Sequence, residues 1–142
     1  MALVKRVDHI TAKFKQRPYY SDVPSNMTIV QGSHDLQPNE NEDAVKQAII
    51  NLLLTNRGER LFKPTVGSDI RASLFENMDA ATESIIKKQI TSTIERYEPR
   101  ASLVGVEVMA DPDTNGLAAT IVFSILNKKE PITLNVLLNR VR

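Results

Sequence analysis

Apolar residues recur at intervals of three and four between positions 45 and 53, which predicts an amphipathic helix with one buried face. The apolar positions are Val45, Ala48, Ile49, Leu52 and Leu53. Asn39 followed by Glu42 predicts an N-cap and its capping-box partner. Gly58 marks the end of this helix, because glycine readily takes the left-handed conformation that follows a helix C-terminus.

Two further helices are expected before residue 98. Ser68 can cap a short one, with Ile70, Leu74 and Phe75 facing inward. Asp79 can cap a longer one, whose buried stripe has spacings of four, four and three. This stripe consists of Ile86, Ile90, Ile94 and Tyr97.

After Pro99 the apolar pattern takes a period of two, which indicates strands. We expect strands at residues 103–109, 117–126 and 132–139, the first two joined by a turn that ends in Asn115-Gly116. Helices followed by a three-stranded antiparallel meander make an α+β fold, in which two to three helices cover the apolar face of the sheet. The edges of so small a sheet stay open unless something covers them.

Residues 1–38 differ from the rest, since they hold three prolines, many polar residues and little periodicity. We expect an extended, partly disordered arm at 1–38, followed by a folded domain at 39–142. The arm is basic over its first 17 residues, through Lys5, Arg6, Lys13, Lys15 and Arg17. Its aromatic residues, Phe14, Tyr19 and Tyr20, are able to anchor the arm on a partner protein. Nucleic acid is a less favoured partner, because the basic residues of the arm are widely spaced and the rest of the chain offers no second basic patch.

The composition narrows the classes of function. The chain of 142 residues has a net charge of +1 and no cysteine, so disulfides and thiolate metal sites are excluded. Balanced charge argues against a commitment to membranes or nucleic acid. The longest apolar stretches are too short to span a bilayer, and we expect no signal peptide and a protein assembled in the cytoplasm.

No metal or cofactor is expected. Residues 111–116 match the opening of a calcium loop, but Val122 stands where the bidentate glutamate belongs, and strands flank the segment. His9 and His34 lie far apart, without carboxylates or serines arranged around them. The glycines are scattered singly, so there is no phosphate-binding loop.

The most informative segment is the corner Tyr97-Glu98-Pro99-Arg100. Pro99 ends the helix and places Glu98 at its C-terminus, where the helix dipole disfavours a carboxylate. Arg96 and Arg100 flank it, so an ion pair is expected, either within the chain or with a neighbouring protein. The corner is therefore either a helix end stabilised by a local salt bridge or an element that binds a neighbouring protein.

A glycoside hydrolase is the enzymatic alternative, with Glu98 or Glu95 as the acid and Asp69 or Glu76 opposite. Such an acid must hold a proton in an apolar pocket. The flanking arginines favour the charged form of Glu98 instead, and the chain has no tryptophan and few other aromatic residues for stacking sugars. We therefore expect no catalytic residue.

Two stretches, residues 51–78 and 94–100, carry a family resemblance. The chain resembles the small baseplate wedge proteins, or sheath initiators, of contractile-tailed bacteriophages, a family with relatives in type VI secretion baseplates. The shared pattern comprises Thr55, Gly58, Arg60, Phe62, Pro64 and Gly67, then Leu74-Phe75-Glu76-Asn77, then Tyr97-Glu98-Pro99-Arg100. The resemblance covers about residues 40–140 and leaves the arm out.

The resemblance implies a structural protein of the virion, located in the tail baseplate and assembled in the bacterial cytoplasm. It implies that the protein joins the other wedge proteins to the first sheath ring and templates sheath assembly by strand addition. Its implied partners are wedge proteins and the tail sheath protein. The arm lies outside the resemblance, and tail tube or inner baseplate proteins are its expected partners. The partner-binding residues are expected to be Arg60, Phe62, Pro64, Tyr97, Glu98, Pro99 and Arg100. The family has also been labelled lysozyme-like, which keeps the hydrolase alternative in view.

Overall fold

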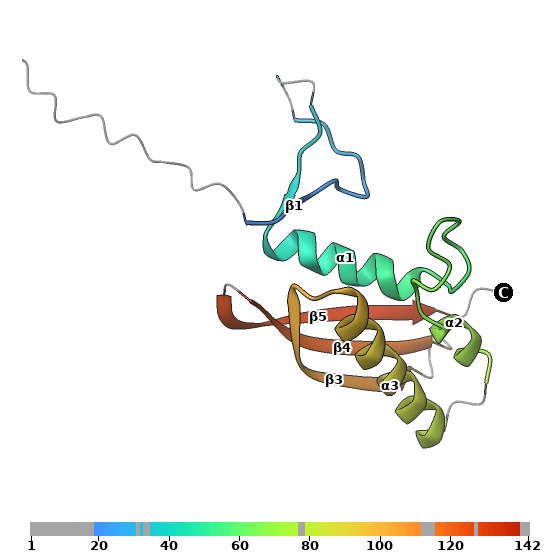
Figure 1. Ribbon diagram of the computed structural model, residues 1–142. Helices are drawn as coiled ribbons and strands as arrows, with labels where there is room; N and C mark the ends of the chain where they lie inside the picture. The colour runs from blue at the N-terminus through green and yellow to red at the C-terminus, as the bar shows by residue number, and fades with distance from the viewer. Residues whose placement is uncertain are drawn as a thin grey trace, which may run out of the picture.

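The computed structural model describes residues 19–30, 32, 35–76, 79–111, 116–126 and 128–139. Its elements, in chain order, are β1 (Ser21–Asp22), β2 (Asn39–Glu40), α1 (Glu42–Leu54), α2 (Ile70–Ser73), α3 (Ala80–Tyr97), β3 (Ala101–Asp111), β4 (Gly116–Ile125) and β5 (Lys128–Asn139). The predicted α+β class is confirmed, with the helices first and the meander last (Figure 1).

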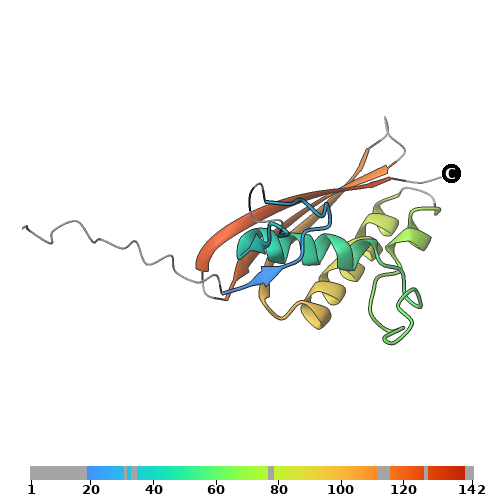
Figure 2. The ribbon, with the colours of Figure 1, turned by 90° about the horizontal axis from the view of Figure 1, so that it is seen from above.

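The main sheet has the strand order β3-β4-β5, with both pairs antiparallel. Val106 pairs with Ile121, which pairs in turn with Leu134, so one buried row crosses all three strands. Helices α1 and α3 lie on the face of the sheet that carries this row, and the view from above shows two layers (Figure 2). β3 extends beyond its predicted limits at both ends, and β5 begins four residues earlier than predicted, at Lys128. β4 is shifted by one residue from its predicted position.

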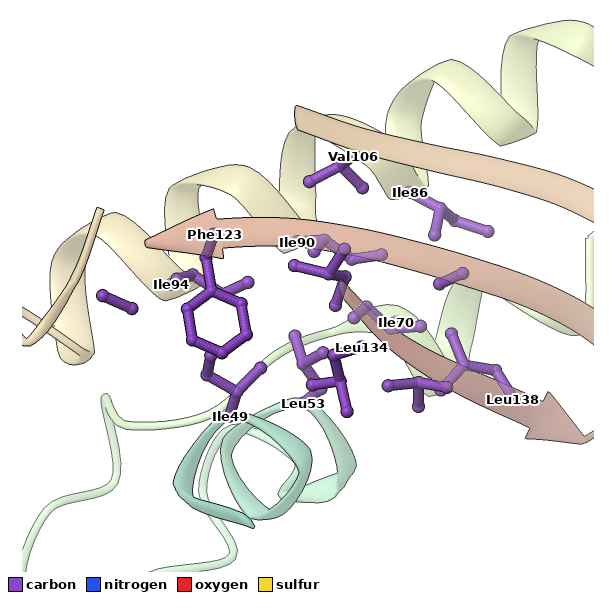
Figure 3. Packing of buried hydrophobic residues seen from close by; sticks show 14 of the residues in the cluster. Ile49, Leu53, Ile70, Ile86, Ile90, Ile94, Val106, Phe123, Leu134 and Leu138 are labelled. Carbon is purple, nitrogen blue, oxygen red and sulfur yellow. The ribbon is translucent and has the colours of Figure 1, made fainter. Parts of the chain in front are cut away.

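The core fills the space between these two layers. The ring of Phe123, which is fully buried on β4, lies between Ile49 of α1 and Ile94 of α3 (Figure 3). Ile86, Ile90 and Ile94 are all fully buried, as the helical spacing predicted. The apolar pattern therefore identified the faces that pack together, because burial of these side chains is the dominant favourable term in folding.

The start and end of α1 differ from the prediction. Asn39 does not cap the helix, because it is paired with Asp22 in a two-stranded sheet and the chain stays extended until Asn41. Glu42 bonds to Lys128 instead of closing a capping box. The helix ends at Leu54, and Gly58 lies in the loop that follows, with a φ of 85°.

The boundaries of the other helices are partly as predicted. Asp79 caps α3, since its side chain accepts a hydrogen bond from the backbone N–H of Thr82 at 2.8 Å. Ser68 does not cap α2, because its hydroxyl donates to the carbonyl of Leu53, and Asp69 holds the position before the helix. Phe75 was predicted to face inward, but it lies beyond the end of α2 and is exposed.

The segment before α1 lies against the domain. Ser21 and Asp22 pair with Glu40 and Asn39, and Tyr20 packs on the core cluster. The backbone N–H of Tyr19 donates to the Asn41 side chain at 3.0 Å. The domain boundary at residues 38 and 39 stays a prediction. His9, Phe14, His34 and the five predicted basic residues of the arm lie outside the described residues.

Candidate partner-binding site

The charged residues of the predicted corner pair with each other. Glu98 follows the last residue of α3, and its carboxylate accepts two hydrogen bonds from the Arg100 guanidinium, at 2.6 and 2.8 Å. The Glu98 side chain is buried, whereas that of Arg100 is 28% exposed. These hydrogen bonds are the main reason why the pKa of Arg100 is raised above its ordinary value. The ion pair expected at this helix end thus forms within the chain.

Arg100 also reaches the segment before α1. The Arg100 guanidinium lies 3.6 Å from the Asp22 carboxylate and 5.4 Å from the centre of the Tyr20 ring. A planar guanidinium can hold a bidentate carboxylate and a ring face at the same time. The corner therefore fastens residues 20–22 to the C-terminal end of α3.

The loop between α1 and α2, residues 55–69, is fixed at its base. The backbone N–H of Ser68 donates to the carbonyl of Thr55 at 2.9 Å, and the N–H of Gly58 donates to the carbonyl of Pro64 at 2.8 Å. Gly67 is required here, since a Cβ at this position would lie 2.6 Å from the carbonyl oxygen of Thr55. Arg57 and Asp69 pair across the base of the loop at 3.0 Å.

Tyr97 ties this loop to α3. Its hydroxyl donates to the carbonyl of Thr65 at 2.5 Å, and Arg96 lies over its ring. Tyr97 was predicted to complete the buried stripe of α3, but it is only half-buried because its hydroxyl reaches across to the loop. A single tyrosine thus joins two segments of the predicted family pattern.

A groove of about 520 Å³ lies between α1, the loop and the corner. It is lined by Asp22, Val23, Gln47, Ala48, Asn51, Leu52, Arg60, Lys63, Val66, Arg96, Tyr97 and Glu98. Leu52 is buried yet belongs to the groove rather than to the core cluster. The groove therefore has a mixed lining along α1, where Ala48 and Leu52 are its apolar residues, and a polar rim.

The rim is basic. Arg60, Lys63 and Arg96 form no ion pair with any residue that the structure describes. The carboxylates of the groove, Asp22 and Glu98, are both engaged by Arg100. The uncompensated charge of this face is therefore positive.

The predicted partner-binding residues are distributed over this face. Arg60, Tyr97 and Glu98 line the groove together. Pro99 is exposed at the corner next to Arg100. Phe62 and Pro64 are exposed on the loop outside the groove.

Several groove residues were not predicted as partner-binding. Lys63 lies between Phe62 and Pro64, within the family pattern, and could have been found there. Gln47 and Asn51 carry no sequence signal of their own, because polar residues on the outer side of a helix are common. Asp22 could not be placed, because its position depends on Arg100, 78 residues further along the chain.

The geometry does not favour acid–base chemistry. Both carboxylate oxygens of Glu98 accept hydrogen bonds from Arg100, so this side chain is engaged within the chain rather than presented to a substrate. The other predicted acid, Glu95, and its predicted counterparts Asp69 and Glu76 do not line the groove. No cluster of potential metal ligands occurs in the described part of the chain, and the core of the predicted calcium loop, residues 112–115, lies outside it. Of the helices in that part, none has the length and apolar character needed to cross a membrane.

Comparison with known proteins identifies the family. The model of the family described as baseplate wedge protein gp25 matches residues 39–129. The chain belongs to this family. Baseplate wedge protein gp25 of Enterobacteria phage T4 is 29% identical over 113 residues, which cover 80% of this chain and 85% of the phage protein. The predicted resemblance and the location in a viral tail baseplate are thereby confirmed.

Solved structures share the fold. A putative tail lysozyme from Geobacter sulfurreducens has a TM-score of 0.67 at 21% identity and covers 73% of this chain and 95% of its own. A chain of the anti-feeding prophage baseplate has a TM-score of 0.60 at 19% identity, with 87% of both chains covered. A chain of the type VI secretion system baseplate complex has a TM-score of 0.54 at 17% identity, covering 67% of this chain and 91% of its own.

Proposed function

We propose that this gp25-family protein is a structural part of a contractile-tail baseplate that joins other wedge proteins to the first sheath ring. In this role it templates the sheath by accepting strands from sheath subunits. Two of the structural neighbours are chains of baseplates, which supports a place among other baseplate proteins. The protein performs no chemistry in this proposal.

The observation that carries the proposal is the pair of long free edges on the main sheet. β3 has 11 residues and β5 has 12, and among the described residues each pairs on one side only, with β4. An extended segment from another protein can add to such an edge through main-chain hydrogen bonds. Copies arranged around a ring would multiply the strength of each modest contact.

The groove face is the proposed attachment to the wedge. It is separate from the edge strands, because the main sheet contributes none of its lining residues. One face of the protein can therefore hold the wedge while an edge strand receives the sheath. The predicted tail tube or inner baseplate contacts of the arm, residues 1–38, stay a proposal.

Backbone hydrogen exchange tests the strand addition. Exchange is measured for baseplates that contain the protein, with and without purified sheath protein. We expect added protection of alternate amides along either β3 or β5, because an added strand bonds to every second residue of the edge. Unchanged exchange at both edges, under conditions where sheath assembles, would rule out strand addition.

The hydrolase alternative has one supporting observation, the structural likeness to a putative tail lysozyme. Glu98→Gln separates the two functions. A hydrolase would lose its activity on purified cell walls with this variant, whereas the wild-type protein is expected to show no such activity. Wild-type cell-wall hydrolysis that Glu98→Gln abolishes would overturn the structural proposal.

A further inference from the structure

The tip of the loop between α1 and α2 presents two adjacent apolar side chains to solvent. Leu61 is 91% exposed and Phe62 is 97% exposed, the highest values among the large hydrophobic residues that the structure describes. The loop projects from the body of the molecule (Figure 2). A single exposed leucine is ordinary, but a fully exposed Leu-Phe pair needs an explanation.

The pair is held on a fixed support. Below the tip, the Gly58–Pro64 hydrogen bond closes the loop, and the Arg57–Asp69 ion pair closes its base. The hydroxyl of Tyr97 holds the side of the loop. A loop already ordered in the free protein loses little conformational entropy when its tip is buried by a partner. The loop therefore holds the tip in a fixed position, in which a partner can bind it at a low entropic cost.

The flanking charges indicate the chemistry of the partner. Arg60 and Lys63 stand on either side of the Leu-Phe pair, and both line the basic groove. Neither forms an ion pair with a described residue. An apolar pair between two unpaired cations is complementary to an apolar pocket with carboxylates on its rim.

We propose that Leu61 and Phe62 insert into an apolar pocket of a neighbouring wedge protein, and that acidic residues at its rim pair with Arg60 and Lys63. This inference rests on the proposed function, since it names the chemistry of the wedge contact. The loop tip is the anchor of that contact, and the groove receives the acidic part of the same partner surface.

Cysteine labelling in purified tail particles tests the insertion. The chain has no cysteine, so Phe62→Cys introduces a single thiol, and the mass of this chain reports its reaction with a maleimide. Lys88→Cys on the exposed side of α3 is the matched control. We expect Phe62→Cys to react at least 10-fold more slowly in tails than in the free protein, and Lys88→Cys to change little.

The outcomes separate this inference from the proposed function. A freely reactive thiol at position 62 in tails that contain the protein would overturn the insertion alone. Equal protection at positions 62 and 88 would also overturn it, because the particle would then shield the chain in general. Absence of the wild-type protein from tails would overturn both. If Phe62→Cys fails to enter tails that accept Lys88→Cys, the tip is needed for attachment, which supports the inference.

Substitutions at the tip and its rim provide a second test. Phe62→Ala is expected to lower incorporation into tails by roughly 10-fold or more, as for a buried anchor, while its urea midpoint matches that of the wild type. Lys63→Glu is expected to lower incorporation more than Lys88→Glu, because only position 63 faces the acidic rim. Incorporation unchanged in both Phe62→Ala and Lys63→Glu would contradict the proposal.

Discussion

At the scale of single residues, the corner depends on one ion pair, and the loop depends on one glycine, which has no side chain. Glu98 and Arg100 satisfy each other within the chain, so the corner acts as an internal fastening for residues 20–22. Gly67 permits the close approach that shuts the loop. These three residues therefore shape the partner-binding face without needing to contact a partner.

The Gly67→Ala variant tests the close approach in the loop. At a φ of 131°, a Cβ would be strained and would also lie 2.6 Å from the carbonyl oxygen of Thr55. We expect a loss of about 2–4 kcal/mol in the free energy of unfolding. The control is Gly58→Ala, where φ is also positive but the Cβ would have no neighbour within 4 Å. Gly58→Ala should lower the free energy of unfolding, measured with urea, by about 1–2 kcal/mol. Equal losses in the two variants would contradict the close approach at Gly67.

Substitutions of Arg100 and Glu98 at the corner are expected to lower the stability by different amounts. Arg100→Ala leaves the buried carboxylate of Glu98 without its partner, so we expect a loss of about 2–3 kcal/mol, reduced because Arg100 is partly exposed. Glu98→Gln keeps a hydrogen-bond acceptor and should cost about 1 kcal/mol. Both variants are expected to stay folded, but Arg100→Ala should release residues 20–22, seen as faster hydrogen exchange there. A larger loss for Glu98→Gln would argue against the internal fastening.

At the scale of elements, the N-terminus of α3 is fixed by Asp79. The backbone N–H of Thr82 donates to its carboxylate, and this hydrogen bond holds the pKa of Asp79 below its ordinary value of 3.8. Because the pKa is lower in the folded state, the stabilisation is complete above pH 3.8 and is lost as the pH falls through the folded pKa.

The Asp79→Ser variant tests this pH dependence. A serine hydroxyl can still cap the helix but carries no charge, so part of the loss of stability below pH 4 should disappear. Asp79→Ala should lower the urea midpoint at pH 7 more than Asp79→Ser does. The measurement is urea unfolding between pH 7 and 3, and identical acid profiles for the wild type and Asp79→Ser would contradict the role of the cap.

The elements could be predicted where the apolar pattern is regular. The Ile86, Ile90 and Ile94 spacing identified α3, and alternation identified β5. The start of α1 could not be predicted, since Asn39 is held extended by pairing with Asp22. Phe75 was misplaced because the helical pattern was continued past the end of α2. Local pattern indicates which side of an element is buried, whereas long-range pairing decides where the element begins and ends.

The site could be predicted only in part, for the same reason. The corner and the loop were recognisable as sequence motifs, and their residues Arg60, Tyr97 and Glu98 do meet in one groove. The groove itself depends on contacts between distant segments, such as the hydrogen bond from Tyr97 to Thr65 and the ion pair of Arg100 with Asp22. No spacing in the sequence carries that information.

At the scale of the whole molecule, the proposed functions occupy different surfaces. The basic groove and the loop tip form the proposed wedge contact, while the free edges of β3 and β5 are the proposed sites of strand addition. The helices and the sheet join these surfaces through one packed core, so their spacing is fixed. A rigid body of this kind can set the position from which a sheath grows.

The central claim is that this protein is held in a tail baseplate through its groove face. The most direct measurement is co-purification of the tagged protein with the co-expressed tail proteins of its own operon, comparing the wild type with Arg60→Ala/Lys63→Ala. We expect the wild type to form a stable complex with wedge proteins and the folded double variant to lose it. A wild-type protein that binds no tail protein, or a double variant that binds as well as the wild type, would contradict the claim.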